Sequence, residues 1–329
     1  MQHSVFITGC ATGFGHRVAQ RFLEQGHRVV ATDRELGEWT ANLQGKDGQL
    51  RTLACDVRCN ASVEQAVTDA LEFAPVDILI NNAGYAIFGT QEEVSADAVQ
   101  DLFDVNVVGL ARVTRALMPA LRAQRGMVIQ LSSVAGRTVF PESGYYAATK
   151  YAVEALSEAL FQETCTFGVR VRLIQPGSFD TQFLPTAVRL SPPRSDDSAY
   201  ADLRPEWDAR KQELLEPPQD PEAVVQAILR QIDDPHPFRR VPVGPDAERI
   251  LQMRDACAPD EWSLLAATRN GLQPQPDDAL HPTAVLQAAH DGRSLPDLAQ
   301  RAHALGHLQH WAEDEDGARA LQLLDRAQT

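Results

Sequence analysis

The alternation of short apolar runs with helical patterns constrains the fold of this 329-residue chain more than any other feature. The apolar runs are rich in β-branched residues and short enough to be buried strands. They lie at residues 5–8, 28–32, 49–54, 78–80, 127–131, 169–174 and 240–243. Strands that alternate with helices form parallel sheets covered by helices. We therefore expect an α/β fold, a doubly wound parallel sheet of about seven strands with helices on both faces.

A glycine-rich turn separates the first predicted strand from a helix expected at residues 17–25. Residues 8–15 read Thr-Gly-Cys-Ala-Thr-Gly-Phe-Gly. Glycines at a strand-to-helix turn let the backbone approach a pyrophosphate, and the helix N-terminus offers free N–H groups. The second predicted strand ends in Asp33, whose carboxylate can accept hydrogen bonds from ribose hydroxyls. Together the turn and Asp33 predict a dinucleotide site.

Polar residues end two further predicted strands. One strand runs into Asn82 and Gly84, and another runs into Ser133. The carboxyl ends of the strands form the ligand crevice of an open parallel sheet. We therefore expect Asn82 and Ser133 to share one site with Gly9 and Asp33.

Tyr146 and Lys150 are the pair most indicative of chemistry. At a spacing of four residues, a helix places both side chains on one face. A phenol with a pKa near ~10 supplies little phenolate at neutral pH, and a neighbouring cation favours the charged form. Tyr145 competes for the role of acid/base, but Tyr146 is the one with a lysine four residues on. The pair predicts a tyrosine general acid/base.

These motifs together resemble those of the short-chain dehydrogenase/reductase family over residues 5–271. The matching segments are residues 8–15, 55–57, 81–84, 104–106, 132–136, 146–150 and 176–181. The resemblance implies a Rossmann-type sheet. Within the family, residues 6–15 and 176–183 are most similar to the hydroxysteroid- and retinol-dehydrogenase-like members.

The resemblance implies hydride transfer between a nicotinamide and a carbonyl or alcohol carbon. Tyr146 would be the general acid/base, and Lys150 would lower its pKa and hold the nicotinamide ribose. Ser133, which lies 13 residues before Tyr146, would bond the substrate oxygen, while Ser132 would point to the opposite face of its strand. Asn106 would hold a water in a proton relay to the lysine, or would be a buried polar group with a structural role.

The resemblance also implies a set of cofactor-binding residues. They are Gly9, Thr12, Gly13, Phe14, Gly15, Asp33, Asp56, Val57, Asn82, Ala83, Gly84, Tyr146, Lys150, Pro176, Gly177, Phe179 and Thr181. A carboxylate at Asp33 would repel the 2′-phosphate of NADP(H), so NAD(H) is favoured over NADP(H). Arg34 follows immediately and could offset part of that repulsion.

Several apolar side chains could form a substrate pocket or belong to the core. They are Phe88, Val139, Phe140, Phe179, Phe183 and Leu184. A pocket of this kind suits a lipophilic secondary alcohol or ketone, such as a steroid, retinoid, terpenoid or aromatic compound. We expect an NAD(H)-dependent oxidoreductase; an NADP(H)-dependent ketoreductase and a non-catalytic dinucleotide-binding regulator are the alternatives. The presence of all four expected catalytic residues argues against the regulator.

The chain is expected to divide into a catalytic domain at residues 1–271 and a linker with a helical extension at 272–329. Within the first part, residues 184–220 are rich in Pro, Ser, Asp and Arg and are expected to form a substrate lid. The extension carries an apolar stripe at Leu298, Ala302, Leu305 and Leu308. That stripe must be buried, over the lid or against a second subunit, and we expect a homodimer or homotetramer.

Composition disfavours other classes of function. The net charge is −15 and no basic run interleaves with aromatic residues, which argues against nucleic-acid binding. No apolar stretch approaches the ~20 residues of a membrane span. The five cysteines include no CxxC pair, and no signal peptide is evident, so a cytoplasmic protein is expected. His303, His307 and His310 could share a helix face, but they have no nearby Cys or carboxylate partner, so no metal is expected.

Overall fold

A computed structural model describes residues 2–179, 188–190, 194–215 and 219–269. The chain divides into two compact units. The first comprises residues 1–201 and 212–248, and the second comprises residues 202–211 and those from 249 onward. Helices α8 (Arg204–Leu215), α10 (Pro245–Ala256) and α11 (Pro259–Arg269) supply most of the described part of the second unit. The predicted domain boundary near residue 271 stays a prediction.

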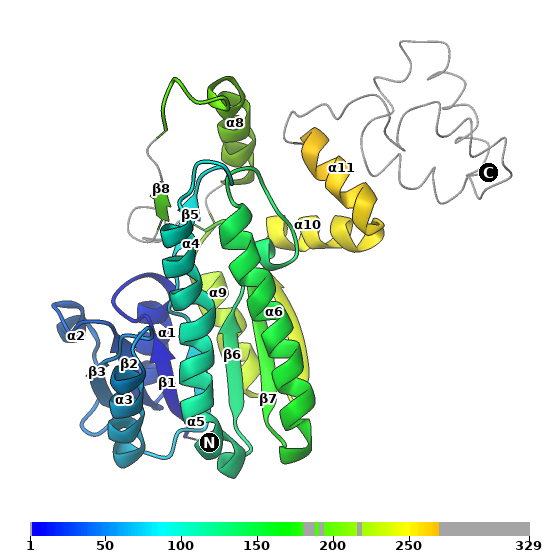
Figure 1. Cartoon of the computed structure of the whole chain (residues 1–329). Coiled ribbons are helices and arrows are strands. Elements are labelled where there is room, and N and C mark those ends of the chain that lie inside the picture. Colours follow the sequence, from blue (N-terminus) through cyan, green and yellow to red (C-terminus); the bar gives the residue numbers. More distant parts are fainter. Residues whose placement is uncertain (1, 180–187, 191–193, 216–218, 270–329) are drawn as a thin grey trace, which may run out of the picture. The chain divides into compact units, whose positions relative to one another are not determined.

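A seven-stranded parallel sheet forms the centre of the first unit (Figure 1). Its strands are β1 (Ser4–Thr8), β2 (Arg28–Asp33), β3 (Leu50–Ala54), β4 (Ile78–Asn81), β6 (Met127–Leu131), β7 (Arg170–Pro176) and β9 (Phe238–Val243). The order across the sheet is β3-β2-β1-β4-β6-β7-β9. All seven strands predicted from the sequence are present, so the predicted fold class is confirmed.

The side chains of β1 show how the sheet is buried on both faces. Val5 and Ile7 point into one hydrophobic cluster, while Phe6 between them points into the other. All three side chains are fully buried. Successive strand residues face opposite sides of a sheet, so a strand covered on both sides reads as a continuous apolar run. This burial explains why the central strands could be recognised in the sequence as continuous apolar runs.

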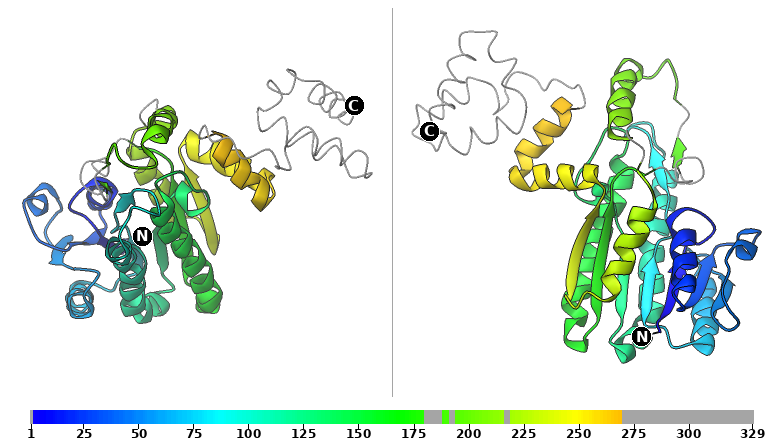
Figure 2. Two further views of the ribbon diagram at one scale, coloured as in Figure 1. Left: turned by 45° about the horizontal axis from the view of Figure 1, so that its top comes forward. Right: turned by 180° about the vertical axis from the view of Figure 1, so that it is seen from behind.

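Helices cover the two faces (Figure 2). The cluster around Val5 and Ile7 takes side chains from α1 (Gly13–Glu24) and α9 (Glu222–Ile232). The cluster around Phe6 takes side chains from α3 (Asn60–Phe73) and α5 (Leu110–Gln124). Helix α6 (Gly144–Thr164) packs with β7 through Val153 and Leu173. Two covered faces and a parallel sheet make the doubly wound arrangement.

The strand order reverses between β1 and β4. From β1 the chain continues to β2 and β3 on one side of β1. It then crosses to the other side of β1 and forms β4, β6, β7 and β9. Loops leaving the carboxyl ends of β1 and β4 therefore diverge and leave a crevice at the switch point. This is where the predicted site residues after β1 and β4 meet.

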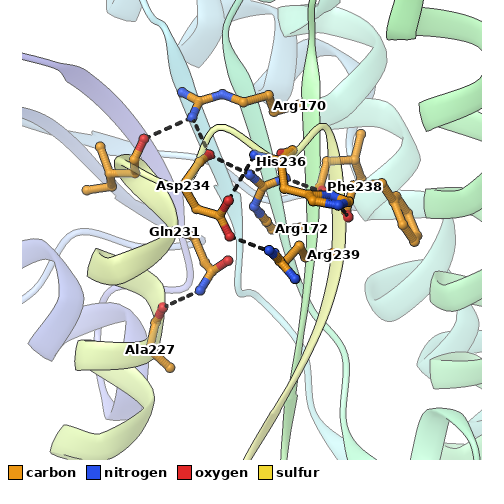
Figure 3. A network of polar contacts seen from close by, with 10 residues as sticks. Arg170, Arg172, Ala227, Gln231, Asp234, His236, Phe238 and Arg239 are labelled. Atoms are coloured by element: carbon orange, nitrogen blue, oxygen red, sulfur yellow. Dashed lines mark hydrogen bonds and ion pairs between the residues drawn. The ribbon is translucent and has the colours of Figure 1, made fainter.

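An arginine cluster fixes the connection between α9 and β9 at the opposite end of β7 (Figure 3). Arg172 is fully buried, and its guanidinium donates to the carbonyls of Asp234 and His236. Arg170 donates to the carbonyls of Ile232 and Asp234 at 2.9 and 3.0 Å. Burial lowers the pKa of Arg172 to about 10. The cluster ties the carbonyls of this loop to the sheet through the guanidinium groups of β7.

The shorter elements include two helices and a two-stranded sheet. They are α2 (Trp39–Asn42), α4 (Ala96–Phe103) and a small parallel sheet of β5 (Ala86–Phe88) with β8 (Val188–Leu190). The predicted lid segment, residues 184–220, therefore contains a strand and helix α8 where an irregular loop was expected. The stripe of Leu298, Ala302, Leu305 and Leu308 and the three histidines lie outside the described residues. Among the helices that are described, none has the length and hydrophobicity to cross a bilayer.

Candidate active site

A cleft of about 440 Å³ opens at the carboxyl ends of the strands, and its lining belongs to the first unit. Most of the predicted residues line it. They are Gly9, Thr12, Gly13, Phe14, Asp33, Asp56, Val57, Asn82, Ala83, Gly84, Ser133, Tyr146, Lys150, Pro176, Gly177 and Phe179. Gly15 and Asn106 are not among the lining residues, and Thr181, Phe183 and Leu184 lie outside the described residues. The cleft thus brings together residues that were predicted from seven separate motifs.

Glycine is required at two positions of the turn after β1, for different reasons. Gly9 has a φ of +73°, and a Cβ there would lie 2.8 Å from the Ala83 Cα atom. A Cβ on Gly15 would lie 2.2 Å from the Gly9 carbonyl oxygen. Gly15 therefore allows α1 to begin against the turn, and its role is packing. Helix α1 begins at Gly13, four residues earlier than predicted, because the glycines form its first turn.

Asn82 holds the glycine turn against the end of β4. Its side-chain amide donates to the carbonyls of Thr8 at 3.0 Å and Gly9 at 2.8 Å. The Thr8 hydroxyl in turn accepts from the backbone N–H groups of Asn82 and Ala83. The Asn82 side chain is therefore occupied within the protein, although the residue lines the cleft as predicted.

Two carboxylates and two guanidinium groups line one end of the cleft. Asp33 accepts from the backbone N–H groups of Ala11 at 2.9 Å and Arg34 at 2.8 Å. Asp56 pairs with Arg58 at 2.8 Å, and the hydrogen bond from Arg58 holds the pKa of Asp56 below its usual value. Arg58 was not predicted from the sequence, and its pairing with Asp56 two residues earlier is the signal that was missed.

Tyr146 and Lys150 both lie on α6, and Ser133 follows the end of β6. The Tyr146 hydroxyl is hydrogen-bonded to the Ser133 side chain. The Lys150 Nζ atom donates to the Leu131 carbonyl at 2.7 Å and lies 5.7 Å from the centre of the Tyr146 ring. The Tyr145 hydroxyl instead donates to the Gln91 carbonyl, and Tyr145 does not line the cleft. The geometry therefore favours Tyr146 over Tyr145, as the spacing predicted.

Burial dominates the protonation of this cluster. It raises the pKa of Tyr146 to about 12, and the hydrogen bond with Ser133 opposes part of that increase. Burial also lowers the pKa of Lys150 to about 8, while the charge of Glu154 raises it. The expected lowering of the Tyr146 pKa by Lys150 is not seen, because the Lys150 ammonium is directed to the Leu131 carbonyl and desolvation of the phenol outweighs its field.

Asn106 lies in a π-helical turn, Asp104–Gly109, between α4 and α5. Its side-chain oxygen accepts from the Tyr85 N–H at 3.0 Å, and its amide donates to the Tyr85 carbonyl at 2.8 Å and to the Thr149 hydroxyl at 3.1 Å. The side chain thus joins α6 to Tyr85, which lines the cleft. These contacts favour the structural alternative for Asn106, and its part in a water relay stays a prediction.

The apolar residues expected around the substrate separate into two groups. Phe88 packs edge-on against Tyr146, with 6.5 Å between ring centres. Phe179 is buried in the core and packs edge-on against Phe14 at 5.9 Å. Val139 is 45% exposed. Phe88 is therefore placed beside Tyr146, whereas Phe179 both packs in the core and lines the cleft.

Comparison with known proteins identifies the family of the chain. A glycine-rich turn after the first strand of a doubly wound parallel sheet is typical of dinucleotide-binding folds. Residues 3–189 match the family model described as short chain dehydrogenase. The chain therefore belongs to the short-chain dehydrogenase/reductase family, as its motifs predicted, and it is an enzyme of the class that acts on alcohol and ketone groups with NAD(P).

Two curated relatives cover most of the chain. The 3-ketodihydrosphingosine reductase of Bacteroides thetaiotaomicron is 34% identical over 268 residues, which are 80% of this chain and 95% of the relative. The 17-beta-hydroxysteroid dehydrogenase type 1 of Homo sapiens is 34% identical over 264 residues, or 76% and 80% of the two chains. A solved short-chain dehydrogenase from Streptomyces avermitilis has a TM-score of 0.70 and 30% identity, covering 83% of this chain and all of that one. The resemblance to hydroxysteroid-dehydrogenase-like members is confirmed.

Proposed function

We propose that this chain is an NAD(H)-dependent oxidoreductase that interconverts a secondary alcohol and a ketone of a lipophilic small molecule. The observation that carries the proposal is the position of the Tyr146 side chain at the carboxyl end of β6. Its hydroxyl is hydrogen-bonded to Ser133, and the Lys150 ammonium lies close to its ring. Tyr146 is the general acid/base, and Ser133 positions the substrate oxygen beside it. The nicotinamide, when bound, supplies or accepts the hydride.

The protonation of the cluster suits donation to a ketone. With a pKa of about 12, the Tyr146 phenol is protonated at neutral pH and has a proton to give to the carbonyl oxygen as it gains negative charge. Lys150, with a pKa of about 8, carries its charge at neutral pH and stabilises the phenolate that remains. In the oxidative direction the same phenol must first be deprotonated, so a higher pH favours alcohol oxidation.

The lining of the cleft fits a dinucleotide. The open side of the glycine turn carries no side chains at Gly9 and Gly13, so backbone N–H groups can approach a pyrophosphate. Asp33 would accept the adenosine ribose hydroxyls, which supports NAD(H). Arg34 and Arg58 line the same end of the cleft and support the alternative, an NADP(H)-dependent ketoreductase.

The apolar contact at Phe88 supports a lipophilic substrate. Its ring lies against Tyr146, so it would lie near the carbonyl group whose oxygen takes the proton from the phenol. Two relatives carry names that refer to lipophilic substrates, a sphingoid ketone and a hydroxysteroid. We therefore propose a long-chain or polycyclic ketone and its alcohol as the substrate class.

Turnover of a small set of ketones tests the proposal. We expect the enzyme to oxidise NADH with 3-ketodihydrosphingosine or a 17-keto steroid as the substrate. We expect little NADH oxidation with a short polar ketone such as hydroxyacetone. The same panel run with NADPH decides between the two cofactors. Faster turnover of the polar ketone, or tighter binding of NADPH than of NADH in calorimetry, would contradict the corresponding part of the proposal.

A further inference from the structure

Three side chains of α6, spaced four residues apart, contact three consecutive residues where β6 ends. The pairs are Tyr146 with Ser133, Lys150 with Leu131, and Glu154 with Ser132. The first two pairs belong to the proposed active site. In the third pair, Ser132 lines the cleft and Glu154, one helical turn further along α6, does not. Neither has a role in the reaction as described above.

The surroundings of Glu154 are built for a buried carboxylate. Glu154 is only 6% exposed. Three side chains donate to it, one from the residue after β6, one from β7 and one from β9. These are the Ser132 hydroxyl at 2.5 Å, the Gln175 amide at 2.9 Å and the Arg240 Nε–H at 2.9 Å. A buried carboxylate is costly unless it is both paired and hydrogen-bonded, and here it is both.

The turn after Ser133 packs closely onto this cluster. A Cβ on Gly136 would lie 2.7 Å from the Ser132 hydroxyl oxygen, 3.1 Å from Glu154 Cγ and 3.2 Å from the Lys150 carbonyl oxygen. Such a close approach leaves Ser132 little freedom to leave the carboxylate. Because Ser132 precedes Ser133, the contact also fixes the backbone from which the proposed substrate-binding hydroxyl projects.

Glu154 also acts on Lys150 through its charge. Burial disfavours the Lys150 ammonium, and the Glu154 carboxylate favours it. Among the described residues, Lys150 interacts with Glu154 through its charge from the same helix, and Arg240 from β9 pairs with it. Arg240 is shared with Glu158 at 2.9 Å. The neighbouring strands β6 and β7 present uncharged partners, the Ser132 hydroxyl and the Gln175 amide.

We propose that Glu154 is a positioning residue of the active site, which fixes the end of β6 through Ser132 and keeps the neighbouring Lys150 ammonium charged. Its effect on Lys150 is a property of the folded chain and can be measured without a substrate. Its consequence for catalysis rests on the proposed function.

The effect of Glu154 on the protonation of Lys150 can be measured directly, because the chain has few lysines. The chain contains three, Lys46, Lys150 and Lys211. Protein labelled with ¹³C-lysine therefore gives three Cε resonances to follow against pH, and the Lys150→Met variant identifies the one from Lys150. In the wild type we expect Lys150 to titrate near pH 8. In Glu154→Gln we expect its midpoint about one pH unit lower, because the favourable charge is gone.

Glu158→Gln is the matched control. Glu158 also pairs with Arg240, but it is exposed, and the Ser132 hydroxyl donates to Glu154 and not to Glu158. This variant should leave the Lys150 titration unchanged. The double variant Glu154→Gln/Arg240→Gln also removes the guanidinium whose Nε–H loses its Glu154 acceptor, so it keeps the measurement possible should the single variant fail to fold. A Lys150 midpoint equal to that of the wild type in both Glu154 variants would overturn the proposal.

The catalytic consequence is read from the pH dependence of ketone reduction. Because the reaction needs the Lys150 charge, the rate of reduction should fall at alkaline pH, where Lys150 loses its proton. The pH at which the rate falls (the alkaline limb of the profile) should be lower in Glu154→Gln, by the same amount as the Lys150 midpoint. A shifted titration with an unmoved alkaline limb would show that Glu154 does not act through Lys150 in the reaction. If no ketone is turned over, the proposed function fails, while the lysine titration still decides the effect of Glu154.

Discussion

At the scale of single residues, Tyr146 is the group on which the proposed chemistry depends. Tyr146→Phe removes the hydroxyl that bonds Ser133 and leaves the ring that packs against Phe88. We expect kcat to fall by more than ~10², the usual contribution of a positioned acid/base, with NADH affinity nearly unchanged. Steady-state kinetics and NADH titration measure the two effects.

Tyr145→Phe is the natural comparison for that variant. It removes a hydroxyl of the same kind from the adjacent position, where the group bonds the Gln91 carbonyl away from the cleft. Its kcat should stay close to that of the wild type. A larger loss from Tyr145→Phe than from Tyr146→Phe would show that the acid/base has been assigned to the wrong tyrosine.

The cofactor preference is a second residue-scale prediction, at Asp33. Its carboxylate accepts two backbone N–H groups in the turn and lies at the end of the cleft that also carries Arg34 and Arg58. Asp33→Ala removes the ribose acceptor and the repulsive charge together, so NADH should bind more weakly and NADPH relatively better. Calorimetric titration with both cofactors checks this, and an unchanged ratio of the two affinities would count against Asp33 as the selecting residue.

At the scale of elements, the join between β1 and α1 depends on the close approach at Gly15. A methyl group there would lie 2.2 Å from the Gly9 carbonyl oxygen and 2.5 Å from the Asn82 amide nitrogen. Gly15→Ala must therefore move the turn or the start of α1. We expect a loss of ~2 kcal/mol or more in the free energy of unfolding, together with weaker NADH binding. Denaturant titration and NADH titration measure these losses.

Gly37→Ala serves as the control for that substitution. A methyl group at Gly37 would meet the Trp39 side chain at 3.7 Å, an ordinary van der Waals distance. Its free energy of unfolding should change by less than ~0.5 kcal/mol. Equal effects of the two substitutions would mean that the turn tolerates a Cβ at Gly15.

At the scale of the whole molecule, the site is contained in the first unit. The described lining residues run from Gly9 to Phe179. We therefore expect a chain that ends at Leu272 to keep NADH binding, and to differ from the full-length protein in oligomeric state or in KM because the apolar stripe at 298–308 is absent. Light scattering after size exclusion, run beside steady-state kinetics, tests both. Equal mass and equal KM would show that the extension is neither an interface nor part of the substrate site.

The sequence alone predicted the central strands, the glycine turn and the placement of Tyr146 and Lys150 on one helix. Central strands are buried on both faces and so appear as apolar runs, and β6 was predicted with its observed bounds. Tyr146 and Lys150 were predictable because helix geometry fixes the relation between residues four apart. The glycine turn was recognisable because only glycine tolerates the backbone of Gly9. Each of these signals is local in the chain.

Tertiary structure alone decided what the polar side chains do once the elements are assembled. Asn82 and Asn106 were predicted as site residues, but their amides bond Thr8, Gly9, Tyr85 and Thr149 within the protein. Glu154 gave no signal in the sequence, because its partners Ser132, Gln175 and Arg240 reach it from three strands that are neighbours only in the sheet order β6-β7-β9. Hydrogen-bond partners and burial set the charge of a side chain, and both depend on segments that meet only when the chain folds.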